Sequence, residues 1–261
     1  MPLVTPQSSS HWYHKDGTPC HTVPMVTDPS KTRDTNLSDA RKMGLYPSVT
    51  SILRILDKPN LDSWKEEQMV MAALTLPVIE GESIDDRARR VIRDAHQQVD
   101  DARKRGSLLH SAVEQYLLFG RAEPHPEVAA LFEPFPAWAN ENILNVHYAE
   151  RVLIGDGYAG TVDLKAEIKG FGVSICDFKS RKPNKGKFAG YDEDCMQLCA
   201  YKAADDRDTS FNAENVLSIF IPSDEPGSPV LKAWDEEDRQ KYGDAFRLAF
   251  DLWTTLKAYK P

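Results

Sequence analysis

The chain has 261 residues, of which 40 are acidic and 32 basic, so its formal net charge is −8. Hydrophobic residues make up 41% of the chain, which excludes a protein that is disordered throughout. The acidic balance argues against a protein that coats nucleic acid through bulk positive charge. It leaves open an enzyme whose local acids bind metal ions and whose local cations bind phosphates.

The sequence also argues against a membrane or secreted protein. The longest apolar stretch, residues 69–79, is shorter than the about 20 residues that span a bilayer. The N-terminus has neither the basic start nor the apolar core of a signal peptide. The cysteines show neither a disulfide framework nor zinc-ligand spacing; they are Cys20, Cys176, Cys195 and Cys199. We therefore expect a cytoplasmic protein that does not contact a membrane.

In chain order, the first predicted region is an extended or partly disordered arm over residues 1–46, with one hairpin at Asp16-Gly17. A single domain is expected over residues 47–261, and its helical part covers residues 47–145. Helical spacing predicts a short helix from residue 49 that Pro59 ends, and a second helix over about 61–76. A long helix capped by Ser83 follows, and Gly106 is expected to interrupt it.

The hydrophobic period changes from helical to two-residue at about residue 146. This pattern predicts strands over 146–154, 158–168 and 172–179, a helix over about 191–206, and strands over 216–221 and 230–234. A final helix is expected from residue 235. The order predicts an α/β (α+β) fold with a central mixed sheet flanked by helices and an α-helical N-terminal half. The sheet core would cover residues 146–234, and the C-terminal helix residues 235–261.

Charged side chains fall near the middle of this predicted sheet. Asp177 and Lys179 share one face of a strand, and burying either charge alone is costly, so they form a terminal ion pair or part of a site. Asp163 lies in the preceding strand, and adjacent strands are about 4.8 Å apart. Asp163 and Asp177 are therefore placed to share one cation, and oxygen ligands of this kind suit magnesium or manganese.

Two predicted helices carry further candidates at one-turn spacing. His110 and Glu114 share a face of one helix, and Gln197 and Tyr201 share a face of another. Taken alone, either pair is more typical of ordinary packing than of a site. Glu150 on the first strand is a possible additional acid.

In order, these motifs read HxxxE, E, GTVD, DFK and QxxxY, and this ordered set resembles the RecB-type exonuclease branch of the PD-(D/E)XK nuclease superfamily. That branch includes stand-alone and phage-encoded enzymes and the mitochondrial genome-maintenance exonuclease. The segment YPSVTSIL at residues 46–53 is also similar to stand-alone and phage-encoded members. The resemblance covers about residues 47–202 and implies a restriction-endonuclease-like core.

The resemblance implies roles for these residues. One or two Mg²⁺ or Mn²⁺ ions would be bound by His110, Asp163, Asp177 and the backbone carbonyl of Phe178. Lys179 would position the attacking water and stabilise charge on the phosphate, and Glu114 would orient the His110 region or bind a second ion through water. Gln197 and Tyr201 would hold the nucleic-acid backbone, with Glu150 and Thr161 as possible supporting residues. No iron–sulfur cluster is expected, because no cysteine follows Cys199.

A basic run leaves directly from the predicted site. It has five cations and no acid, namely Lys179, Arg181, Lys182, Lys185 and Lys187. We interpret it as a phosphate-contacting loop, although such runs are usually solvated loops. Aromatic residues that could stack on bases, or simply pack in the core, are Trp12, Tyr13, Trp64 and Tyr191.

The sequence thus predicts a metal-dependent DNA exonuclease that acts on free ends of single-stranded DNA, in replication, recombination, repair or phage DNA metabolism. Its partners would be DNA and proteins of replication or recombination. One alternative is an endonuclease specific for flaps or branches, and another is a non-catalytic nucleic-acid-binding protein on the same fold. A metalloprotease is disfavoured because the chain has no HExxH motif.

Overall fold

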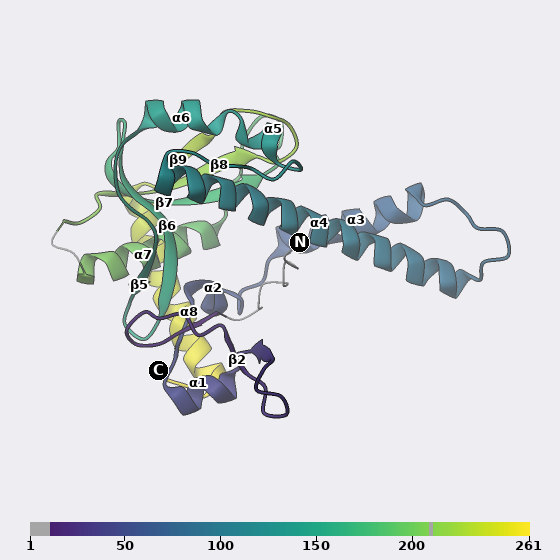
Figure 1. Cartoon of the computed structure of the whole chain (residues 1–261), viewed down its shortest axis with the longest axis horizontal. Coiled ribbons are helices and arrows are strands. Elements are labelled where there is room, and N and C mark those ends of the chain that lie inside the picture. Colours follow the sequence, from purple (N-terminus) through teal and green to yellow (C-terminus); the bar gives the residue numbers. More distant parts are fainter. Residues whose placement is uncertain (1–10, 209–210) are drawn as a thin grey trace.

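The computed structural model describes residues 11–208 and 211–261, and a five-stranded sheet forms its centre (Figure 1). The strands lie in chain order: β5 (Ile143–Ile154), β6 (Ala159–Ile168), β7 (Gly172–Arg181), β8 (Asn215–Pro222) and β9 (Val230–Ala233). All neighbours are antiparallel except β7 and β8, which are parallel. The predicted mixed α/β fold is confirmed, with the sheet in the C-terminal half and helices mostly N-terminal.

Helices cover both faces of this sheet and bury a separate apolar cluster on each (Figure 1). One face carries α4 (Ile84–Phe119), α5 (Ala129–Phe132) and α6 (Phe135–Asn142), and its cluster includes Leu109 and Leu164. The other face carries α2 (Val49–Leu53), α7 (Asp192–Asp208) and α8 (Glu236–Lys257), with Leu198 and Phe246 in its cluster. The sheet is therefore the middle of three layers, and it holds residues from β6 and β7 between α4 and α7.

Two features of the helical half differ from the prediction. Pro59 begins α3 (Pro59–Thr75) as its first residue, where proline is well tolerated, and α2 already ends at Leu53. Gly106 does not interrupt α4, which is continuous over 36 residues. A glycine inside a helix costs only about 0.5–1 kcal/mol relative to alanine. Burial of the following turns of α4 against the sheet outweighs that local cost.

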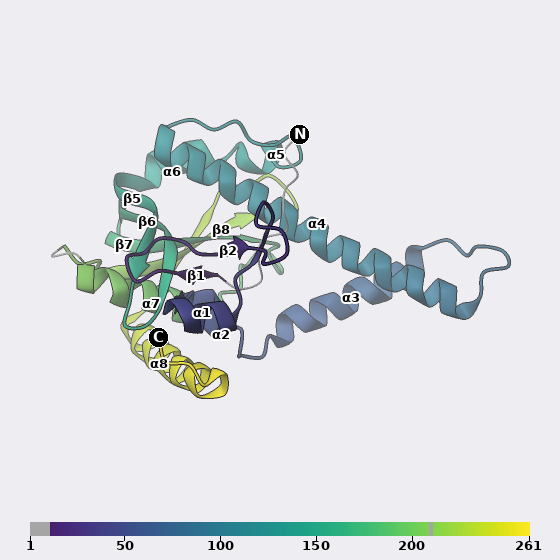
Figure 2. The same cartoon turned by 60° about the horizontal axis from the view of Figure 1, so that its bottom comes forward.

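Helices α3 and α4 form a long hairpin that projects from the body (Figures 1 and 2). The start of α4 is capped at Ser83, whose side chain accepts a hydrogen bond from the Asp86 backbone amide. The base of the hairpin lies beside the sheet, where the last turns of α4 pack on it. This arrangement places the middle of α4 at the edge of the body.

The N-terminal segment differs from the predicted arm. Residues 11–46 contain β1 (Trp12–Tyr13), β2 (Thr22–Pro24), β3 (Thr32–Asp34) and α1 (Leu37–Met43), and β1 pairs with β4 (Tyr46–Pro47). Trp12 is only 3% exposed and contacts the rings of Trp253 and Tyr259. This stretch is thus part of the folded body, while residues 1–10 of the predicted arm lie outside the described residues. None of the described helices is long and apolar enough to span a membrane.

Candidate active site

Three carboxylates lie level with one another across three adjacent strands. On β5, Glu150 falls between the partners of Val162 and Leu164, which places it opposite Asp163 of β6. On β7, Asp177 follows Cys176, the partner of Leu164, so the antiparallel register brings it level with Asp163 as well. Two of these acids are buried, Asp163 at 9% and Asp177 at 3% exposed. Like charges held this close destabilise one another unless a cation lies among them.

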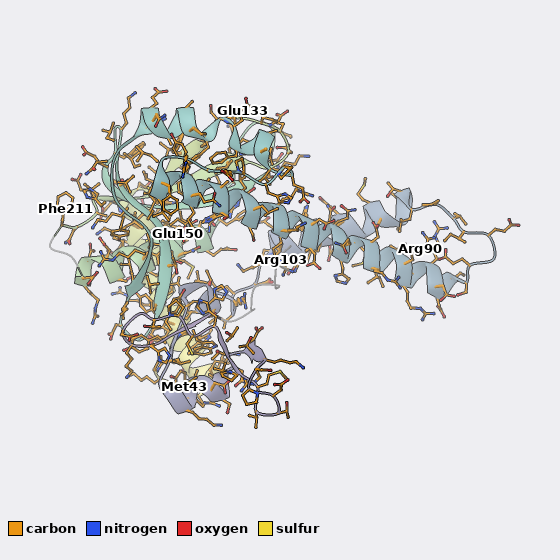
Figure 3. The ribbon with its side chains drawn as sticks, in the orientation of Figure 1. Met43, Arg90, Arg103, Glu133, Glu150 and Phe211 are labelled. Carbon is orange, nitrogen blue, oxygen red and sulfur yellow. The ribbon has the colours of Figure 1, made fainter. Side chains whose placement is uncertain are left out.

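Glu150 has an unusual backbone conformation for this position. Its φ is +49°, in the left-handed region that residues with a side chain rarely adopt, and the β5–β6 register shifts nearby, between Val146 and Tyr148. Irregularities of this kind bend a strand and redirect a side chain, and they are frequent next to active sites. Glu150 lies on the strands within the body of the molecule (Figure 3), and it approaches His110 of α4.

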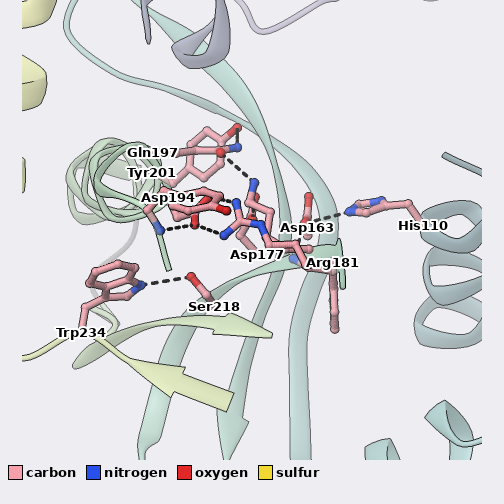
Figure 4. Close-up of polar contacts among 12 residues, drawn as sticks. His110, Asp163, Asp177, Arg181, Asp194, Gln197, Tyr201, Ser218 and Trp234 are labelled. Carbon is pink, nitrogen blue, oxygen red and sulfur yellow. Dashed lines mark hydrogen bonds and ion pairs between the residues drawn. The ribbon is translucent and has the colours of Figure 1, made fainter. Parts of the chain in front are cut away.

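His110 of α4 completes a group that has the composition of a metal site. Its Nε2 lies 3.0 Å from Oδ2 of Asp163 (Figure 4). Its Nδ1 lies 4.0 Å from Oε1 of Glu150. One ligand atom from each of these three residues lies within 4.8 Å of the others. The Phe178 backbone amide donates a 2.7 Å hydrogen bond to the same Asp163 oxygen and so fixes that carboxylate.

The charges in this group shift one another's pKa values. Burial opposes charging of His110, but the adjacent Asp163 carboxylate raises its pKa to about 9. Burial raises the pKa of Asp163, but His110, with Lys179 and the Phe178 amide, overcomes this effect and lowers the pKa of that acid. Burial, and then repulsion by Asp163, raises the pKa of Glu150 to about 7. In the absence of a metal ion, a proton on His110 therefore balances the negative charge.

A second polar group begins on β7 and continues onto α7. Lys179 Nζ lies 2.6 Å from Oδ2 of Asp177 and donates a 3.0 Å hydrogen bond to Oε1 of Gln197. The Gln197 side-chain amide in turn donates to the Tyr201 hydroxyl, also at 3.0 Å (Figure 4). Burial raises the pKa of Asp177 to about 6 despite the attraction of Lys179, and among the described residues no aligned hydrogen-bond donor reaches its Oδ2. This buried oxygen has only the ion pair with Lys179 as compensation.

The structure therefore divides the predicted ligand set in two. Asp163 and His110 come together as expected, but the third member of their group is Glu150, predicted only as a supporting residue. Asp177 is paired with Lys179 instead, and the group at Phe178 that contacts Asp163 is its amide. Gln197 contacts Lys179 and Tyr201 contacts Gln197, so the arrangement shown is one that orients the lysine.

A groove of about 1300 Å³ opens over these residues. Glu114 lines it one turn beyond His110 and forms no hydrogen bond or ion pair with any residue that the structure describes. Thr161 lies 3.2 Å from the hydroxyl of Tyr13, which brings β1 to the wall of the groove. The sequence pattern assigns Tyr13 to the arm, as a residue that could stack on bases or pack in the core, and does not predict its contact with Thr161. The only local signal is a pair of adjacent aromatic residues, at positions 12 and 13, in a polar segment.

In the basic run at the end of β7, one cation forms an ion pair with a buried acid and the lysines that follow it are exposed. Arg181 forms two 2.7 Å contacts with the buried Asp194 and lies over the ring of Tyr191, so it stabilises the start of α7. Lys185 and Lys187 are exposed, and Lys182 is exposed with Asp224 at 3.9 Å. The predicted phosphate contact thus concerns these lysines more than Arg181.

No protein-family model matches this chain, and no curated protein matches it significantly. The argument for function therefore depends on the arrangement of its residues.

Proposed function

We propose that this protein is a metal-dependent DNA exonuclease that hydrolyses phosphodiester bonds from free ends of single-stranded DNA. The observation that carries this proposal is the meeting of two groups on one groove. The first, His110 with Glu150 and Asp163, has the composition of a cation site, and the second presents the ammonium of Lys179. A divalent cation beside a fixed lysine is suited to phosphodiester hydrolysis, because both stabilise the negative charge that develops on the phosphate.

The donor set fits magnesium or manganese. Carboxylate oxygens from Asp163 and Glu150 suit both ions, and the imidazole of His110 suits manganese better. Asp177 lies level with Asp163 on the neighbouring strand and Glu114 lines the same groove, so these two acids are the candidates to bind a second ion directly or through water. When bound, such an ion would lower the pKa of its water and offset the charge of the phosphate.

The chain's own residues supply the remaining functions. Lys179 keeps its positive charge, because Asp177 raises its pKa despite burial, so it is suited to stabilise negative charge developing on the phosphate. Gln197 and Asp177 hold the lysine from two sides. The exposed lysines after β7 would attract the phosphate backbone toward the groove.

The preference for free ends and the role in replication, recombination, repair or phage DNA metabolism follow from the resemblance in sequence motifs. A structure-specific endonuclease and a non-catalytic binding protein would use the same groove, and the experiment below separates them.

The test uses linear single-stranded, linear duplex and circular single-stranded DNA, each linear strand labelled separately at its two ends. Each DNA is incubated with magnesium, manganese or chelator, beside a Lys179→Ala control. We expect metal-dependent and lysine-dependent loss of linear strands while circles remain intact. Cleavage of circles would make the protein an endonuclease. A lack of any lysine-dependent product, with RNA tested as well, would replace the proposal with the binding-protein alternative.

A further inference from the structure

A second groove, of about 630 Å³, lies between the base of the α3–α4 hairpin and the loop after β7. Trp64 of α3 and Arg105 of α4 line it, together with Lys182. Arg105 is exposed and forms no ion pair within the described part of the chain. Trp64 is half-buried and belongs to none of the hydrophobic clusters of the body. An aromatic ring and an unpaired cation in one groove are the pairing that binds a base and a phosphate.

This second groove meets the groove of the candidate active site. Both are lined by the same three small residues, Ala102 and Gly106 of α4 and Ser180 of β7. His110 faces the active-site groove one turn beyond Gly106, while Arg105 faces the second groove. The middle of α4 therefore lies where the two grooves adjoin, and Gly106, which has no side chain, lies at this junction.

Gly106 needs no left-handed backbone here, and a Cβ at this position would meet no atom within 4 Å. Neither backbone conformation nor packing thus explains a glycine in the middle of a helix, where alanine is favoured. What the glycine does provide is space, because any side chain at this position would enter the junction of the two grooves.

We propose that Gly106 keeps open a passage through which single-stranded DNA runs from the active site to Trp64 and Arg105. This inference rests on the proposed function and adds a path for the strand beyond the scissile phosphate. Along this path Trp64 stacks on a base and Arg105 binds a phosphate. The occupant is a single strand, because a base can reach Trp64 only when it is free of a partner strand.

The test compares binding of labelled single-stranded DNA of 4 and 15 nucleotides by fluorescence anisotropy, with chelator present to prevent hydrolysis. Gly106→Phe should weaken binding of the 15-mer by about tenfold or more and leave the 4-mer within about twofold, since only the longer strand occupies both grooves. Trp64→Ala and Arg105→Ala should also weaken binding of the 15-mer. Trp64→Phe should keep most of the wild-type affinity, because it retains an aromatic ring. Arg93→Ala is the matched control, because Arg93 is exposed on the same helix but lines neither groove.

Thermal unfolding of each variant shows whether weaker binding comes from a blocked passage or from a misfolded protein. Gly106→Leu provides a smaller obstruction if Gly106→Phe unfolds. Unchanged 15-mer binding in the Gly106, Trp64 and Arg105 variants, or equal loss for both lengths, would overturn the passage. If the wild type binds no DNA, the passage fails, and the cleavage experiment alone decides the proposed function. If it binds with the expected dependence on length but cleaves nothing, the proposed function fails and the passage is supported.

Discussion

Two lysines on neighbouring strands make ion pairs of the same length in very different surroundings. Lys165 of β6 lies 2.6 Å from Asp205 of α7, and both side chains are closed off, at 2% and 0% exposed. Asp205 also accepts a 2.7 Å hydrogen bond from the Tyr148 hydroxyl, and Lys165 donates to the backbone carbonyl of Phe211. Lys179 of β7 is equally close to Asp177, but its side chain is 22% exposed and faces the groove.

The difference separates a pair that serves the fold from a pair whose surroundings suit the proposed site. A buried ion pair is tolerated when further hydrogen bonds satisfy its atoms, as they do around Lys165 and Asp205. Asp177 lacks such partners for one of its oxygens, and its lysine faces open space. Buried polar atoms that lack hydrogen bonds and lie beside a groove are typical of sites in which a substrate or ion supplies the missing contacts.

Breaking the buried pair of Lys165 and Asp205 should give the largest effect, and that effect is on stability. Lys165→Met leaves the carboxylate of Asp205 buried without its cation, so we expect the free energy of unfolding to fall by about 3–5 kcal/mol. Urea unfolding followed by circular dichroism measures this loss. The double replacement Lys165→Met with Asp205→Leu removes both charges and should recover most of it. A double variant as unstable as the single one would contradict this interpretation of the pair.

Replacing the lysine of the Lys179–Asp177 pair with methionine should change activity far more than stability. Lys179→Met removes a positive charge directed at the groove, and we expect the cleavage rate to fall about 10²–10³-fold. The raised pKa of Asp177, about 6, eases its protonation when the lysine is lost, so the urea midpoint should move much less than in Lys165→Met. Cleavage within a few-fold of wild type would exclude Lys179 from the reaction.

The sequence predicted the part of this contrast that depends on local pattern. Two-residue alternation identified the three strands, and the spacing of neighbouring strands predicted that Asp163 and Asp177 lie close together, as the register of β6 and β7 confirms. The pattern did not predict the role of Glu150, because that depends on a left-handed residue beside a register shift. Nor did it predict that Trp12 would pack on Trp253, because contacts between the two ends of a chain leave no local signal.

Gly106 and Arg181 show a related limit. Local propensity predicted a break at Gly106, but packing of α4 on the sheet keeps the helix continuous. Charge pattern placed Arg181 in a phosphate-binding loop, but the acid that binds it, Asp194, lies on the next helix. In both cases the deciding partner is remote in sequence.

The affinity for a metal ion at His110, Glu150 and Asp163 should depend on pH, which the buried Lys165–Asp205 pair gives no reason to expect. A metal ion requires neutral His110 and ionised Glu150, whose pKa values are raised to about 9 and about 7. Between pH 7 and 9 binding must displace the proton of His110, so manganese affinity should rise about tenfold per pH unit and level off above pH 9. Below pH 7 the proton on Glu150 adds to the slope. Titration calorimetry in two buffers of different ionisation enthalpy counts the released protons, and a pH-independent affinity would exclude His110 as a ligand.

The smallest effect should come from the residues that hold Lys179. Gln197 accepts a hydrogen bond from the lysine and donates one to Tyr201, so Gln197→Ala frees the lysine to move without removing its charge. We expect about a five- to tenfold lower kcat with little change in KM, because one hydrogen bond of about 1 kcal/mol is lost and the substrate contacts remain. Tyr201→Phe keeps the ring that packs against Gly160 and tests the far end of the chain of contacts, with a smaller loss. A raised KM with unchanged kcat in Gln197→Ala would instead place Gln197 in contact with the nucleic-acid backbone, as the sequence motif implies.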